Sequence, residues 1–343
     1  MRLAASLVGF GPHDGAHRVA ARAGVSVLVP LLVLLATDHL AWSAYVAFGA
    51  FTSLYGRTRV GGSRLRMQSA LGLLLTSLIT LGVLVGSYDG RAWLAVPLAA
   101  VVAAGASVAS DTWQWHPPGA LFPVFAFTAC ASVPSSPSDA VTALLVAGAT
   151  AAFSVVVGNA GSWVRRLRGR APAVEPPPAP GEVAAENRLR TLALPSGLAV
   201  LAAGSLATAV GIGHPYWAMV SAVVPLAARS RSAQVTRGVQ RIVGTGLGLV
   251  VAGVVLALEP EGLVLVLTVV ALQVVAELLV GRNYALALVA ITPLALLMVH
   301  LASPVPARDL LVDRGVETVI GVAVGLAVAQ LLALRRERLP DAA

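Results

Sequence analysis

The sequence consists mainly of long apolar blocks, and their length constrains the fold more than any other feature. Each block has about 17 to 25 residues, the length that an α-helix needs to cross the hydrocarbon core of a bilayer. Because that core holds no water to hydrogen-bond the backbone, a crossing segment must be helical. The chain is 57% hydrophobic and only 12% charged, about half the charged share of a soluble domain. We therefore expect an all-α integral membrane protein.

Hydropathy and helix-breaking residues together predict about twelve transmembrane helices, six in each half of the chain. They span residues 19–37, 41–56, 66–86, 92–110, 117–133, 139–163, 191–211, 214–229, 238–257, 262–281, 283–301 and 309–334. The second and the eighth are the shortest of these segments.

The arginines give the predicted helices an orientation. All 24 basic residues are arginine, and positive side chains stay mainly on the cytoplasmic side of a membrane. With both termini inside, 21 arginines are cytoplasmic and only Arg91, Arg308 and Arg314 lie outside. One missed or invented span in mid-chain would destroy this separation. The sequence thus predicts a multi-pass protein of the cell (cytoplasmic) membrane. Because the arginines flank apolar blocks, they argue against nucleic-acid binding.

The chain also contains an internal repeat. Residues 171–187 are rich in proline and separate two halves with similar features in the same order. The matched pairs are His39–His214, Trp42–Trp217 and Arg66–Arg241 at an offset of 175, then Pro123–Pro293, Asp139–Asp309 and Arg165–Arg335 at an offset of 170. We predict a first six-helix repeat at 1–170, a cytoplasmic linker at 171–187 and a second six-helix repeat at 188–343. Six helices per copy give both copies the same orientation, so the repeats are parallel.

The second half carries a recognisable pattern of residues. It comprises Tyr216-Trp217, Arg241 followed by Gly244-Thr245 and Gly248, then Arg282-Asn283-Tyr284, Thr292-Pro293, and Arg314 followed by Glu317. With these residues the sequence resembles the fusaric acid resistance (FUSC) family, which is related to aromatic acid exporters and to plant aluminium-activated malate channels. The first half resembles the family less closely, because Ser69-Ala70 replaces the glycine and threonine after Arg66. The resemblance implies export or permeation of small organic anions, often aromatic carboxylates.

Several polar and aromatic residues are candidates for binding such an anion. Arg237 and Arg241 lie on one helix face at the cytoplasmic entry of their span, where guanidinium groups can hold a carboxylate with two hydrogen bonds. The alternative is that they anchor the helix to lipid phosphates. Trp217, with Tyr216 and Trp42, would form an aromatic belt at the outer membrane edge or stack on an aromatic substrate. The predicted substrate-binding residues are Arg66, Arg237, Arg241, Arg282, Tyr284, Thr292 and Trp217.

Two acids inside apolar spans are candidates for proton coupling, because an ionisable group within the membrane is by default functional. Glu277 follows Gln273 by one helical turn, and a structural ion pair with Arg282 or Arg241 is the alternative. Glu317 is predicted to lie deeper than Asp313 and Arg314, which we place at the interface, and to pair with Arg314.

Helix breaks and small residues complete the candidates. Pro123 and Pro293 fall at equivalent places in the two halves and predict matched interruptions at a binding site between the repeats. The alternative is that each proline only kinks its helix for packing. Gly244 and Gly248 form a GxxxG pair that permits close helix contact.

We therefore expect a transporter that exports small organic anions, driven by the proton gradient. A passive anion channel and a non-transporting scaffold or accessory subunit are the alternatives. No catalytic residues, metal site or cofactor are predicted, so we do not expect an enzyme. The predicted partners are the lipid bilayer and the anion, with the chain acting as a monomer or homodimer. The sequence predicts no particular accessory protein.

Overall fold

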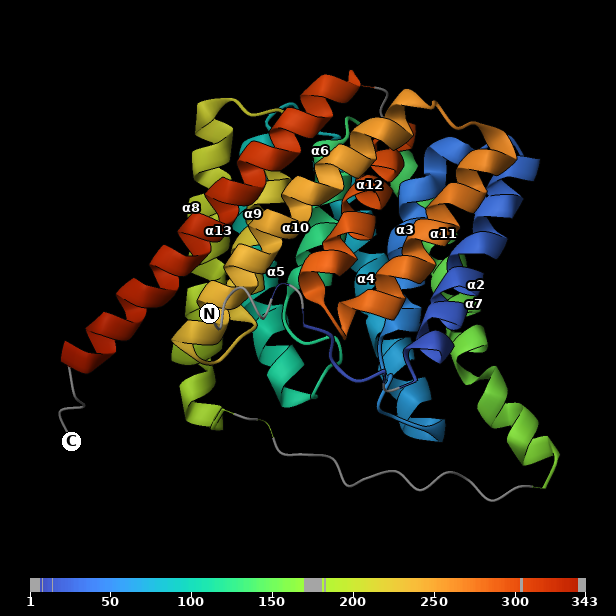
Figure 1. Cartoon of the computed structure of the whole chain (residues 1–343), viewed down its shortest axis with the longest axis horizontal. Helices are drawn as coiled ribbons and strands as arrows, with labels where there is room; N and C mark the ends of the chain where they lie inside the picture. Colours follow the sequence, from blue (N-terminus) through green and yellow to red (C-terminus); the bar gives the residue numbers. More distant parts are fainter. Residues whose placement is uncertain are drawn as a thin grey trace.

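The computed structural model describes residues 7, 9–13, 15–169, 181, 183–302 and 305–338, and within them it contains α-helices and no strand. In these described residues, twelve α-helices, labelled α2 to α13, make up the bundle in Figure 1. They are α2 (Ala16–Ala36), α3 (Ser43–Ala50), α4 (Gly61–Gly86), α5 (Arg91–Thr112), α6 (Leu121–Ser132), α7 (Asp139–Leu167), α8 (Leu194–Val210), α9 (Tyr216–Leu226), α10 (Arg231–Ala257), α11 (Gly262–Val280), α12 (Tyr284–Ala302) and α13 (Ala307–Arg338).

Each predicted span overlaps one of these helices. In the described part of the chain, nine helical segments are long and apolar enough to cross a membrane. Three apolar stretches are shorter: Leu40–Leu54, Leu121–Ser132 and Tyr216–Leu226. The first consists of α3 between two 3₁₀ turns, Leu40–Trp42 and Phe51–Leu54. The expectation of an all-helical membrane protein is confirmed.

Pro123 does not interrupt its span, and that prediction is wrong. The helix α6 begins at Leu121, so Pro123 lies in its first turn, where a missing backbone N–H leaves no helical hydrogen bond unmade. The two prolines Pro117 and Pro118 precede the helix and delay its start. Pro293, in contrast, does lie inside α12.

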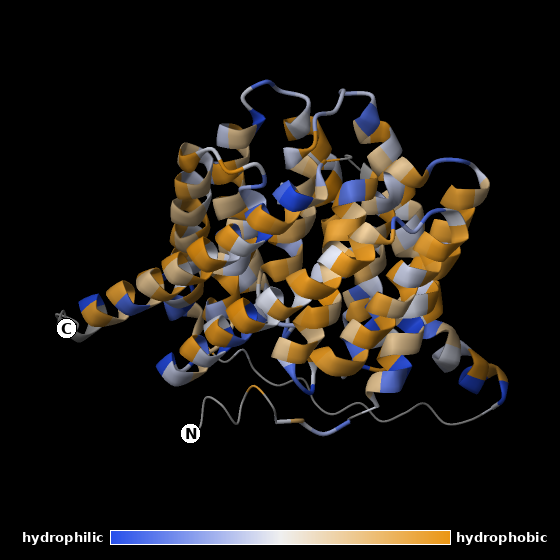
Figure 2. Ribbon diagram, turned by 45° about the horizontal axis from the view of Figure 1, so that its top comes forward, coloured by the Kyte–Doolittle hydropathy of each residue, from blue (hydrophilic) through white to orange (hydrophobic). Residues whose placement is uncertain are grey.

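The helix ends gather on two opposite faces of the bundle (Figure 1). The arginine-rich face contains the connections 55–60, 113–120, 227–230 and 281–283, and there Arg59 Nη2 donates to the carbonyl of Trp113 over 2.8 Å. The opposite face contains the connections 37–39, 87–90, 133–138, 211–215 and 258–261. Hydrophilic residues concentrate at these ends while the helix bodies are mainly apolar (Figure 2), as expected of segments that cross hydrocarbon.

Helix packing is similar in the two halves. In the first half α4 packs on α6 and α7, α3 on α7, and α5 on α6; in the second half α10 packs on α12 and α13, α9 on α13, and α11 on α12. The halves also interlock, because α5 packs on α8 and α11 packs on α2. Further contacts join α6 to α9 and α12 to α3.

The predicted linker lies mostly outside the described residues, which exclude 171–180 and 182. Its described end contains a 3₁₀ turn, Ala185–Asn187, and a π-helical turn, Leu189–Ala193, leads from it into α8.

Close contact between α10 and α12 depends on glycine. A Cβ on Gly248 would lie 2.7 Å from both the carbonyl oxygen of Leu288 and Cβ of Thr292, and one on Gly244 would overlap the carbonyl oxygen of Ala285. No side chain fits at either position without moving the α12 backbone. The prediction that this GxxxG pair allows close helix contact is confirmed.

Candidate functional site

A cavity of about 1360 Å³ lies among the helices of both halves. Typical small-molecule pockets measure about 300–1,000 Å³, so this one is large. The first half contributes side chains from α3 and α6, and the second half contributes side chains from α9 to α13. The lining runs from residues of the arginine-rich face, such as Arg57 and Arg229, to residues of the opposite face, such as His214 and Asp309.

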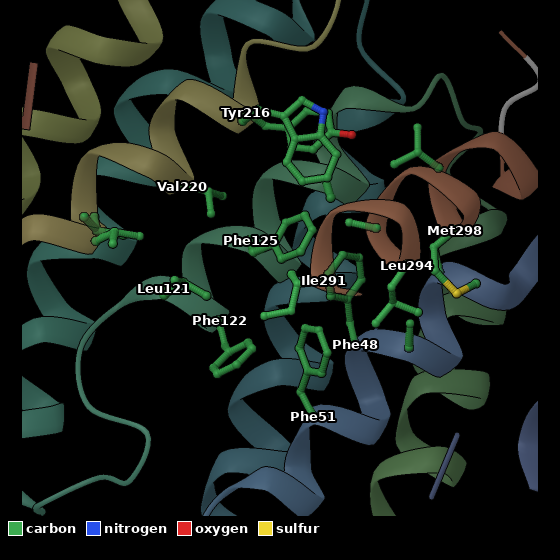
Figure 3. A pocket seen from close by; sticks show the side chains of 18 of the residues that line it. Phe48, Phe51, Leu121, Phe122, Phe125, Tyr216, Val220, Ile291, Leu294 and Met298 are labelled. Carbon is green, nitrogen blue, oxygen red and sulfur yellow. The ribbon is translucent and has the colours of Figure 1, made fainter. Parts of the chain in front are cut away.

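Aromatic rings surround the middle of this cavity (Figure 3). Phe48 and Phe125 meet edge to face with ring centroids 4.9 Å apart, and Phe51 lies 4.7 Å from Phe122. Phe125 also contacts Trp217, with centroids 5.2 Å apart. Such clusters bury large apolar surfaces and prefer tilted or edge-to-face geometry. The middle of the cavity is thus suited to a flat apolar group.

Two arginines of α10 converge on Tyr284 beside the cavity. Arg241 is only 3% exposed; its Nη1 donates to the Tyr284 hydroxyl over 3.1 Å and its Nη2 to the Ser221 hydroxyl over 3.4 Å. The Arg241 Nε has no hydrogen-bond partner within the described residues. Arg237 is exposed, and its guanidinium lies 5.0 Å from the centroid of the Tyr284 ring. Both cations line the cavity, where a guanidinium fork can bind a carboxylate.

Glu277 also lines the cavity, and it is paired with Arg57, which was not among the predicted site residues. The buried Glu277 carboxylate lies 3.3 Å from Nη2 of Arg57. The predicted pairing of Glu277 with Arg282 or Arg241 is wrong: Arg241 is turned toward Tyr284, and Arg282 donates from Nε to the Gly11 carbonyl and stacks on Phe10.

A second buried cluster lies toward the opposite face. Arg314 is 1% exposed, and its guanidinium carbon lies 3.9 Å from the centroid of the Trp217 ring, a cation–π contact. Among the described residues, Nε and Nη1 of Arg314 have no hydrogen-bond partner, and Glu317 is fully buried. Nearby, Nδ1 of His214 lies 2.8 Å from the Asp313 carboxylate.

This cluster corrects two predictions. Arg314 is not interfacial, because α9 and α10 pack around α13 at its level and enclose it. Tyr216 and Trp217 are buried inside the bundle, so the aromatic-belt alternative is wrong for both. The predicted pair of Glu317 with Arg314 is not among the ion pairs within 4 Å in the described part of the chain.

The structure brings together some of the predicted site residues and separates others. Trp217, Arg237, Arg241, Glu277 and Tyr284 line the cavity. The remaining residues lie outside its lining. Arg66 is exposed on α4, Arg282 holds the N-terminal segment, Thr292 is buried against Gly248, and Glu317, Pro123 and Pro293 are buried in the bundle.

The four phenylalanines, Arg57 and Arg314 line the cavity but were not among the predicted site residues. A signal for the phenylalanines was present, because Phe48 and Phe51 in one span and Phe122 and Phe125 in another repeat a three-residue spacing. Residues at i and i+3 share a helix face, so each pair points one way. No spacing in the sequence marks Arg57 or Arg314. Arg57 contacts Glu277 of the other half, and Arg314 on α13 contacts Trp217 on α9, so both contacts depend on how distant segments pack.

Comparison with known proteins identifies the class of protein. Residues 200–328 match the family described as fusaric acid resistance protein-like. A relative described as the uncharacterized membrane protein YvaC from Bacillus subtilis (strain 168) is 32% identical over 152 residues. The aligned part is 43% of this chain and 24% of the relative, so the chain spans about a quarter of that relative's length. No solved structure matches.

The apolar helices and the relative together define a multi-pass membrane protein. Within that class, the segment 200–328 is similar to the fusaric acid resistance protein-like family. The resemblance inferred from the second half of the sequence is confirmed.

Proposed function

We propose that this protein exports small organic anions through the cavity, and that aromatic carboxylates fit it best. The observation that carries the proposal is the juxtaposition of a cavity lined by aromatic rings with Arg241, which is buried and, among the described residues, bonded only to neutral hydroxyls. A carboxylate would bind the guanidinium groups of Arg241 and Arg237, while a flat ring would pack among Phe48, Phe125 and Trp217.

The proposed direction follows from orientation. The arginine-rich face would be cytoplasmic, so both termini lie inside and the anion enters from the cytoplasm between Arg57, Arg229 and Arg237. These three arginines line the cavity at that face. Positive side chains at the mouth raise the local concentration of anions.

The two halves would act as parallel six-helix repeats, with boundaries at 1–170 and 188–343. Support comes from the corresponding packing of α4 with α6 and α10 with α12, and from the exchanged contacts of α5 with α8 and α11 with α2. The cavity between the halves then lies where transporters built from repeats hold their substrates. Because one chain supplies both repeats, a monomer would be sufficient.

The proton gradient would drive export through Glu277 and Glu317. Glu277 borders the cavity and can exchange its Arg57 partner for a proton. Glu317 is fully buried one helical turn from Asp313, whose contact with His214 lies toward the opposite face. Acids within membrane segments commonly relay protons in transporters.

The experiment is uptake of radiolabelled aromatic acids into inverted membrane vesicles with an imposed proton gradient. We expect protein-dependent accumulation of at least one acid from a broad panel, abolished when the gradient is collapsed. Equal accumulation with and without the protein, for every acid tested, would refute the proposal. Large unitary currents in planar bilayers, together with uptake that survives collapse of the gradient, would instead indicate a passive channel.

A further inference from the structure

Asp111 pairs with Arg188 over 3.2 Å, and two further ion pairs at the arginine-rich face connect the two halves of the chain. In one, Nη2 of Arg229 lies 2.7 Å from Oδ1 of Asp111. In the other, Nη2 of Arg57 lies 3.3 Å from Oε2 of Glu277. Asp111 and Arg57 belong to the first half, and Arg229 and Glu277 belong to the second. Each pair therefore takes its acid from one half and its arginine from the other.

The two pairs occupy corresponding places in the two halves. Asp111 lies near the end of α5 and Glu277 near the end of α11, the fourth helix of each half. Arg57 follows the short stretch Leu40–Leu54, and Arg229 follows the short helix α9, which are the second apolar segments of each half. Each pair thus joins the fourth helix of one half to the connection that follows the second apolar segment of the other half.

The surrounding chain repeats the same arrangement. The backbone N–H of Val183 and Nε of Arg188, in the segment just before α8, contact the Asp111 carboxylate at the end of α5. The segment just before α2 contacts the end of α11, where Gly11 N–H donates to the Arg282 carbonyl and Asn283 Nδ2 donates to the Leu7 carbonyl. Each half thus begins with a segment fixed to the fourth helix of the other half.

We propose that these two ion pairs are matched latches that close the arginine-rich mouth of the cavity and open when an anion enters. Arg57, Arg229 and Glu277 line the cavity, so separating either pair widens the entrance. In each pair the acid is buried, while the arginine side chain is 25% exposed at Arg57 and 45% exposed at Arg229. An arginine that already contacts solvent can be rehydrated when the pair opens, so opening costs less than for a fully buried pair.

The chemistry of the latches suits an anionic substrate. Asp111 and Glu277 present to the arginines the same group that a substrate carboxylate presents, so the substrate can replace them one for one. The arginines stay paired during entry, Asp111 keeps its contact with Arg188, and Glu277 takes up the proton of the proposed coupling, so no buried charge is left uncompensated. This step of replacement rests on the proposed function, whereas closure of the mouth by the two pairs does not.

Accessibility of a cysteine behind the latches tests closure without any substrate. Val224 is buried, lines the cavity and lies on α9, five residues before Arg229. Val224→Cys is placed in a Cys130→Ala background, because Cys130 is the chain's single cysteine, and the protein is purified into lipid nanodiscs. The rate of modification by a bulky, membrane-impermeant maleimide is then measured.

We expect Asp111→Asn and Glu277→Gln each to raise the labelling rate severalfold, and the double variant to raise it further. Glu261→Gln, an exposed acid on the opposite face, is the matched control and should leave the rate unchanged. The exchange Arg57→Glu with Glu277→Arg restores an ion pair, and we expect it to return the rate toward that of the unsubstituted background.

Unchanged labelling in the folded double variant would overturn the proposal and leave the pairs as static ties between the halves. Thermal unfolding of each variant in nanodiscs shows whether it is folded. A different result would contradict only the proposed substrate class. In that result the substitutions raise the labelling rate as expected, but no organic acid raises the labelling rate of the unsubstituted background.

Discussion

Among the described side chains, two arginines, Arg241 and Arg314, are buried within the bundle. A buried guanidinium is normally paired with an acid, yet Arg241 donates to the neutral hydroxyls of Tyr284 and Ser221. Arg314 stacks on Trp217 instead. Their positive charge is therefore available to an anion that enters the cavity.

Arg241→Ala should weaken substrate binding strongly. A hydrogen bond to a charged group contributes about 1.5–3 kcal/mol, so we expect KM for the transported acid to rise about 10- to 100-fold. Arg241→Lys, which keeps the charge but loses the fork, should give an intermediate value. The measurement is the concentration dependence of uptake into vesicles.

Arg66→Ala is the matched control for this substitution. Arg66 was predicted to repeat Arg241 in the first half, but it is exposed on α4 and lies outside the cavity lining. Its replacement should leave KM unchanged. If both substitutions raise KM equally, the arginines act through general surface charge, and a specific site at Arg241 is contradicted.

For single residues, the sequence predicted which side chains form the site better than it predicted where they lie in the bundle. Arg237, Arg241 and Tyr284 do meet beside the cavity, because residues of α10 and the start of α12 come together where those helices pack. Arg314 was placed at the interface by counting residues along its span. Its burial depends on which helices surround α13, and that information is not local to the sequence.

At the scale of single helices, the contact between α10 and α12 shapes one wall of the cavity. Gly244 and Gly248 allow the two backbones to approach closely, and this approach places Arg241 next to Tyr284. Small residues at such positions are typical of helix packing within membranes.

Gly248→Ala should therefore destabilise the protein. The added Cβ would lie 2.7 Å from the Leu288 carbonyl oxygen, and overpacking of this kind costs about 1–3 kcal/mol. Gly246→Ala on the same helix has no heavy atom within 4 Å of its added Cβ and should be neutral or slightly stabilising. Thermal unfolding in detergent compares the two; equal midpoints would contradict the packing described for α10 and α12.

The existence and order of the helices could be predicted because hydropathy over about twenty residues is a local property. The short segments α3, α6 and α9 were predicted too long at one end or both. Prolines 117 and 118 precede α6, and 3₁₀ turns flank α3. The packing of α5 on α8 and of α11 on α2 could not be predicted from local sequence patterns, because it depends on how whole helices pack.

At the scale of the whole molecule, the cavity is where the two halves meet. Aromatic side chains from α3 and α6 of the first half face residues from α9 and α12 of the second. If the anion crosses here, the route can be blocked by filling the cavity, and the same side chain placed on the outside of the bundle should have no effect.

Uptake of a transported acid by Ile291→Trp and Val250→Trp variants tests this route most directly. Ile291 lines the cavity among the rings in Figure 3, whereas Val250 is 69% exposed on the outside of α10. Thermal unfolding first shows that both variants are folded. We then predict that Ile291→Trp abolishes uptake and that Val250→Trp transports at the wild-type rate. Wild-type uptake by a folded Ile291→Trp variant would contradict a path through this cavity.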